Sequence, residues 1–82
     1  MTNQGTVWAT DLPHRWAVGN ARTMAPYWDR QAELYEANER DYTARGMDRH
    51  AAYERQEARK ARAEAERCRQ ILADLLAEGV QS

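Results

Sequence analysis

The sequence predicts an all-α protein built as an antiparallel helical hairpin, with helices at about 26–45 and 48–78. Ala, Glu, Arg, Leu and Lys account for 40 of the 82 residues, and a share near one half is typical of long helices. Small and apolar residues recur at alternating intervals of four and three, which is the period of a helix–helix seam. Gly46 separates the two periodic stretches. These observations favour two helices that fold back on each other.

The N-terminal segment, residues 1–25, is expected to be irregular. It contains two glycines and Pro13 and keeps no sustained apolar period, which favours turns and loops over a helix. The segment also carries Trp8 and Trp16, whereas disordered tails are poor in aromatic residues. We therefore expect this segment to pack either on the hairpin or on a partner.

The first helix is expected to begin at Pro26, because the missing N–H of proline would have no partner at a first helical position. Gly46 is expected to end that helix, since glycine readily adopts the left-handed backbone found at helix C-termini. Asp48 is expected to cap the second helix. No helix breaker follows before Gly79, so residues 79–82 are left as a tail.

The two helices are expected to meet through large side chains on one and alanines on the other. Folding the chain at Gly46 gives three successive layers of this kind: Tyr42–Ala51, Tyr35–Ala58 and Trp28–Ala65. Large residues set against small ones produce the close packing that an interface needs. On one flank, acidic residues of the first helix lie beside arginines of the second: Asp29 and Glu36 beside Arg62 and Arg55.

The strongest apolar cluster lies beyond the expected start of the first helix. Its members are Cys68, Ile71, Leu72, Leu75 and Leu76. The hairpin places this cluster level with residues of about 17–25. Either the N-terminal segment covers the cluster, through Trp16, Val18 and Met24, or another chain does.

No catalytic site, metal site or cofactor is expected. The histidines, His14 and His50, and the cysteine, Cys68, form neither a metal-ligand set nor a nucleophile with an oriented base. Cys68 is interpreted as a small buried residue. A single cysteine excludes an internal disulfide and favours a reducing compartment. Because no long apolar run or signal-peptide pattern is present, we expect a cytoplasmic protein that does not bind membranes.

Protein binding is the function that the sequence favours. Trp, Tyr and Arg most often anchor interfaces, and the chain has three, four and eleven of them. We expect a non-catalytic module that docks on a larger macromolecular assembly, as a small accessory subunit or as a phage-type inhibitor of a host complex. The residues expected to contact the partner are Trp8, Trp16, Ile71, Leu72, Leu75, Leu76, Arg55, Arg59, Arg62 and Arg69.

Two alternatives remain open from the sequence. The first is a small nucleic-acid-binding regulator that uses the arginine stripe of the second helix, although the net charge of −1 lacks the expected basic footprint. The second is a parallel homodimer through the seam of the second helix. In that dimer Glu57 would meet Arg62 of the other copy, and Glu64 would meet Arg69.

Overall fold

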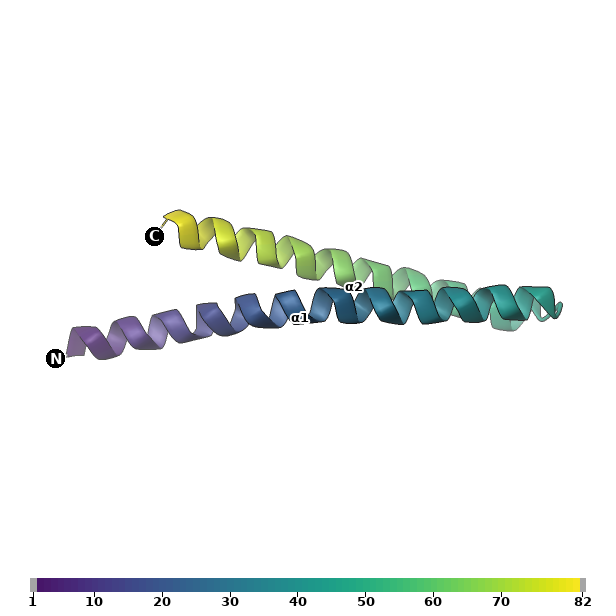
Figure 1. Cartoon of the computed structure of the whole chain (residues 1–82), viewed down its shortest axis with the longest axis horizontal. Helices are drawn as coiled ribbons and strands as arrows, with labels where there is room; N and C mark the ends of the chain where they lie inside the picture. Colours follow the sequence, from purple (N-terminus) through teal and green to yellow (C-terminus); the bar gives the residue numbers. More distant parts are fainter. Residues whose placement is uncertain (1, 82) are drawn as a thin grey trace.

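In the computed structural model the chain forms two antiparallel helices joined by a tight turn (Figure 1). α1 spans Thr2–Ala44 and α2 spans Asp48–Gln81. The structure describes the backbone of residues 2–81 and the side chains of residues 14–78. The molecule is a rod of 68 × 19 × 14 Å, with both chain ends at the end opposite the turn. The predicted all-α helical hairpin is confirmed.

α1 is longer than the sequence predicts. It begins at Thr2, so the expectation of an irregular segment over residues 1–25 is wrong. Pro26 lies in the helix interior, where it removes a backbone hydrogen bond at a cost of about 3 kcal/mol. Ala21 and Ala25 are only 4% and 7% exposed, so the preceding turns pack on α2. Burial against α2 therefore outweighs the local preference for irregular structure at these residues.

The end of α1 follows the prediction made from Gly46. Its φ angle is +75°, in the left-handed region that favours glycine. The N–H of Met47 donates to the carbonyl of Tyr42 at 2.9 Å, and the N–H of Gly46 donates to the carbonyl of Thr43 at 3.0 Å. These two bonds form the Schellman motif that ends many helices.

The start of α2 differs by one residue from the prediction. The N–H of Ala51 donates to the carbonyl of Met47 at 3.0 Å, which places Met47 at the N-cap position. Asp48, expected as the cap, is instead the first residue of α2. An aspartate there still lies beside the positive end of the helix dipole.

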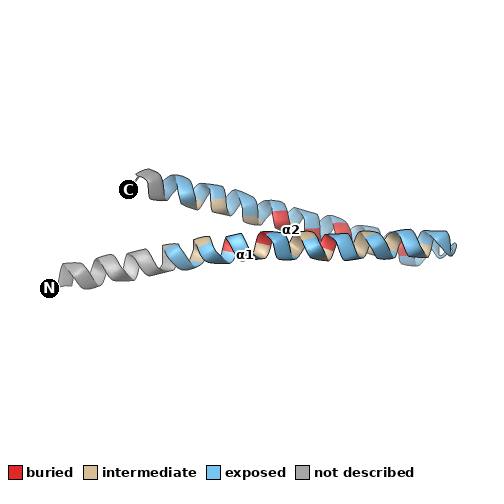
Figure 2. Ribbon diagram, in the orientation of Figure 1, coloured by how far each residue is buried: buried red, intermediate tan, exposed pale blue. Residues whose placement is uncertain are grey.

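The contact between the helices is made of small side chains. Among the described side chains, the buried apolar residues are Ala21, Ala25, Ala32, Ala51, Ala58, Ala61 and Ala65. Figure 2 shows these positions on both helices where the helices lie against each other. The rings of Trp28, Tyr35 and Tyr42 are half-buried, as the predicted layers require. Among the described residues, neither helix combines the length and apolar character needed to cross a membrane.

Candidate protein-binding surfaces

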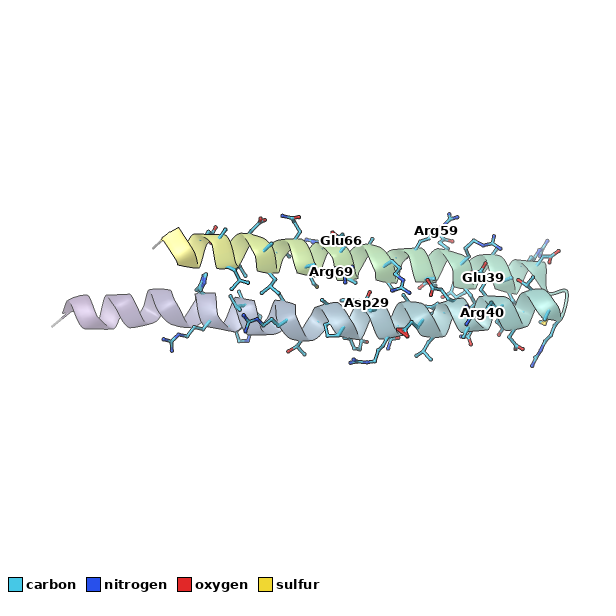
Figure 3. The ribbon with its side chains drawn as sticks, turned by 45° about the horizontal axis from the view of Figure 1, so that its top comes forward. Asp29, Glu39, Arg40, Arg59, Glu66 and Arg69 are labelled. Carbon is cyan, nitrogen blue, oxygen red and sulfur yellow. The ribbon has the colours of Figure 1, made fainter. Side chains whose placement is uncertain are left out.

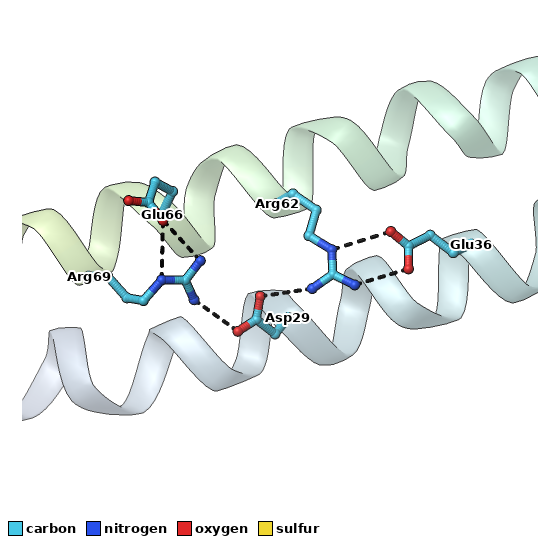
Figure 4. A network of polar contacts seen from close by, with 5 residues as sticks. All are labelled: Asp29, Glu36, Arg62, Glu66 and Arg69. Carbon is cyan, nitrogen blue, oxygen red and sulfur yellow. Dashed lines mark hydrogen bonds and ion pairs between the residues drawn. The ribbon is translucent and has the colours of Figure 1, made fainter.

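One side of the hairpin, called here the network side, is held together by charges. The guanidinium of Arg62 donates to Glu36 at 3.0 and 3.2 Å and to Asp29 at 3.1 Å. Arg69 donates to the other oxygen of Asp29 at 2.9 Å and to Glu66 at 3.1 Å (Figure 4). The hydrogen bond with Glu36 raises the pKa of Arg62, and that with Glu66 raises the pKa of Arg69. Asp29 thus links two arginines of α2.

The predicted contact between Asp29 and Arg62 is present, but the predicted contact between Glu36 and Arg55 is wrong. Arg55 donates to Glu39 at 2.7 Å, while Glu36 accepts from Arg62. The observed partner of Arg55 lies one turn further along α1 than the predicted one. The long arginine side chain can span this distance, so the packing of the alanines need not change.

The predicted arginine stripe is therefore not a free basic surface. Arg55, Arg62 and Arg69 all contact carboxylates, and charge already paired within the chain attracts an external phosphate weakly. Arg59 points away from α1 on the outer face of α2 (Figure 3). Of the four predicted arginines, Arg59 alone lies apart from the network side.

Trp16 does not cover the apolar cluster of α2. It lies two residues from Val18 on α1, and because Val18 is half-buried in the seam, Trp16 lies on the opposite face. Its exposed fraction is 72%. The half-buried members of the cluster, Cys68, Leu72 and Leu75, lie against the extension of α1, in which Met24 is also half-buried. The side chain of Trp8 lies outside the described residues.

The predicted apolar patch is divided by the seam. Leu72 and Leu75 are half-buried between the helices, and Ile71 and Leu76, each 41% exposed, flank the seam on its two sides. Cys68 is half-buried as well. The predicted partner-binding residues whose side chains the structure describes therefore do not form one continuous surface.

The opposite side of the hairpin, called here the aromatic side, is hollowed between the helices at two places along the described residues. One hollow, of about 460 Å³, is lined by Trp28, Tyr35, Glu57, Lys60, Ala61 and Glu64. The other, of about 330 Å³ and nearer the turn, is lined by Tyr42, Arg49, His50, Tyr53 and Glu54. Lining residues of the two hollows lie seven positions apart, and residues at that spacing share a helix face. Both hollows therefore open on the same side.

Several exposed apolar residues on or near the aromatic side were not among the predicted site residues. Leu34 is 59% exposed, Tyr53 60% and Tyr27 39%. Tyr27 also makes an edge-to-face contact with Trp28, with ring centroids 5.1 Å apart. Tyr27 and Tyr53 stand out in the sequence because they fall outside the seam, and Leu34 does so for the same reason.

The parallel homodimer through the seam of α2 is not compatible with this hairpin. The seam residues that it would use, such as Ala58 and Ala65, are buried against α1. Arg62 and Arg69, which it would pair with glutamates of the other copy, contact Asp29. Any pairing of two copies must use another surface.

The described side chains also bear on metal binding. Among residues 14–78, no group of three or more His, Cys, Asp and Glu side chains is arranged to hold a metal ion. The ring of His50 lies 5.0 Å from that of Tyr42 in a tilted stack, so part of its surface is covered by an aromatic neighbour.

Comparison with known proteins finds no matching family model, no similar curated protein and no similar solved structure.

Proposed function

We propose that this chain is a non-catalytic protein-binding module that docks on a larger macromolecular assembly through Trp16. The observation that carries the proposal is the exposure of this ring. Trp16 is 72% exposed, whereas the buried apolar side chains among the described residues are all alanines. Tryptophan is among the residues that contribute most to binding when a partner covers them.

The surroundings of Trp16 suit insertion into a partner's pocket. The residues one and two turns further along the same face are small and polar: Asn20 and Thr23. The hydroxyl of Thr23 donates to the carbonyl of Gly19 at 2.9 Å, so it turns back onto its own helix. On the side toward the turn, the indole ring is therefore bordered by short polar side chains, which leave room for a partner to cover it.

The nucleic-acid alternative is less well supported by the arrangement of charges. Sequence-independent binding depends on arginines and lysines free to neutralise phosphates. Three of the four stripe arginines contact carboxylates of the same chain. A protein partner therefore fits the surface better than a polyanion does.

A photo-crosslinking residue in place of Trp16, introduced in the cells that carry the gene, tests the proposal. The matched control carries the same residue at Ala37, which is exposed and three heptads along the same face. We expect one defined protein adduct from position 16 and none from position 37. Equal adducts from both positions, or none from position 16, would contradict the proposal.

The captured partner then allows an affinity measurement. Trp16→Ala is expected to weaken binding by at least about 30-fold, which corresponds to about 2 kcal/mol. Its helix content, measured by circular dichroism, should stay unchanged because the ring is exposed. The same complex separates the two proposed roles: lost activity of the assembly on adding the protein indicates an inhibitor, and unchanged or raised activity indicates an accessory subunit.

A further inference from the structure

We propose that a second copy of the chain covers the aromatic side, so that α1 packs antiparallel on α1 of the second copy and α2 packs antiparallel on α2. The inference goes beyond the proposed function, because it names a second copy of the chain as the occupant of the aromatic side. Four observations support it. Exposed apolar residues lie on the aromatic side, residues of α2 can pair with opposite charges in a second copy, residues of α1 can pair without like charges, and the contact area is large enough for a dimer.

The two sides of the hairpin differ in what they leave unpaired. On the network side, Asp29 and Glu36 are held by arginines of α2. On the aromatic side, Leu34 and Tyr53 are 59% and 60% exposed, and Tyr53 lines one of the hollows that open between the helices. Exposed apolar groups gathered on one side mark an interaction surface. The aromatic side is therefore the side that a second chain would cover.

Outside the buried seam, α2 carries a second row of residues at alternating intervals of three and four. Its members are His50, Tyr53, Glu57, Lys60, Glu64, Arg67, Ile71 and Asp74. Rows with this spacing form helix–helix contacts, and the members that line the hollows show that the row faces the aromatic side. An antiparallel copy of α2 can lie along this row.

A two-fold axis at the level of Arg62 gives this row complementary partners throughout. The pairs between copies are His50 with Asp74, Tyr53 with Ile71, Glu57 with Arg67 and Lys60 with Glu64. Each pair occurs twice because the contact is symmetric. No like charges meet, and opposite charges placed across an interface select the register. Within one copy, Lys60 contacts Glu57 at 3.1 Å, so Glu64 of the second copy would extend an existing ion pair.

The same axis also suits α1. Arg62 and Asp29 lie 3.1 Å apart across the hairpin, so an axis at Arg62 passes α1 at Asp29. About that level the row of α1 on the aromatic side pairs Asn20 with Asn38, Met24 with Leu34, and Tyr27 with Gln31 of the second copy. All of these side chains are uncharged, so the contact involves no repulsion. The oppositely charged pairs of α2 and the uncharged pairs of α1 are therefore compatible with the same two-fold axis.

The area is sufficient for a stable dimer. The axis lies near the middle of the described hairpin, so the two copies overlap along residues 14–44 of α1, about 45 Å at 1.5 Å per residue. A strip of that length and 14–19 Å wide covers roughly 650–850 Å², and standard interfaces bury about 800 Å² per partner. A dimer over the full length meets that requirement.

Sedimentation of the purified chain tests the proposal. At about 100 µM the wild-type chain is expected to sediment as a dimer, since even a Kd near 10 µM leaves mostly dimer at this concentration. Arg67→Glu places Glu57 opposite a glutamate of the second copy and should raise the dimer Kd at least tenfold. The double variant Glu57→Arg with Arg67→Glu restores opposite charges and should recover the dimer.

Two further variants complete the test, and circular dichroism checks that each variant remains helical. Arg59→Glu makes the same charge change on the outer face of α2 and should leave the dimer intact. Leu34→Arg places a charge in the α1 contact and should dissociate it. A monomeric wild type, a double variant that stays monomeric while helical, or an equal effect of Arg59→Glu overturns the inference. These measurements use the purified chain alone, so they are independent of whether Trp16 captures a partner.

Discussion

Arg62 of α2 donates hydrogen bonds to both carboxylate oxygens of Glu36 on α1, at 3.0 and 3.2 Å. A paired contact of this kind constrains direction as well as distance. The most buried residues between α1 and α2 are alanines, which are small and alike, so this directional contact helps to fix how far one helix is shifted along the other. The register, in turn, decides which residues lie on the aromatic side.

Removing the Arg62 guanidinium should weaken the hairpin. Arg62→Gln is expected to lower the urea midpoint, measured by circular dichroism, because Glu36 and Asp29 lose their shared partner. Arg59→Gln removes the same charge from the outer face and should leave the midpoint unchanged. The difference should shrink at about 1 M salt, where screening shortens the range of exposed charges to about 3 Å. A difference independent of salt would show that the contact is not electrostatic.

The alanine layers should not tolerate a larger side chain. Ala65 has no exposed surface, so Ala65→Leu is expected to lower the free energy of unfolding by about 1–3 kcal/mol. Ala63→Leu adds the same atoms on the exposed face and should change it little. Urea titrations of both variants measure the difference. Equal stability of the two variants would mean that the helices do not meet at Ala65.

The same substitution at two glycines should have opposite effects. A Cβ at Gly19 would meet nothing within 4 Å, so Gly19→Ala should raise the free energy of unfolding by up to about 1 kcal/mol through helix preference. A Cβ at Gly46 would also meet nothing within 4 Å, but its φ of +75° makes Gly46→Ala unfavourable by about 1–2 kcal/mol. Thermal melts of the two variants should therefore move in opposite directions.

Pro26→Ala should stabilise the protein, because α1 runs through this position. Alanine supplies the N–H that proline lacks, and the expected gain is about 1–3 kcal/mol. Helix content should rise or stay constant. A lower midpoint would indicate that the chain around Pro26 is not in a helix interior, as the sequence alone suggested.

The hairpin could be predicted from the sequence because its signals agree with each other. Gly46 marks the turn, and the alanines from Ala51 to Ala65 recur at the spacing of a seam. The contact between Asp29 and Arg62 follows from folding the chain at that glycine. These features involve residues on either side of the turn. The short connection there allows few alternative alignments of the two helices.

The N-terminal part of α1 could not be predicted because local and long-range signals conflict there. Ala21 and Ala25 continue the series of Trp28 and Ala32 at intervals of four and three, but Pro26 interrupts it with a strong preference against a helix interior. Packing against α2 decides whether the alanine spacing or the proline determines the local structure. The exposure of Trp16 depends on that decision, since its orientation is defined only once α1 is continuous.

A distance measurement between α1 and α2 tests the hairpin most directly. Spin labels at Thr23→Cys and Gln70→Cys, in a Cys68→Ser background and diluted with unlabelled protein, report on one chain at a time. We expect a single narrow distribution, because packed helices have axes about 8–10 Å apart. A broad distribution, or one near the roughly 70 Å that a single continuous helix would give between these positions, would contradict the hairpin.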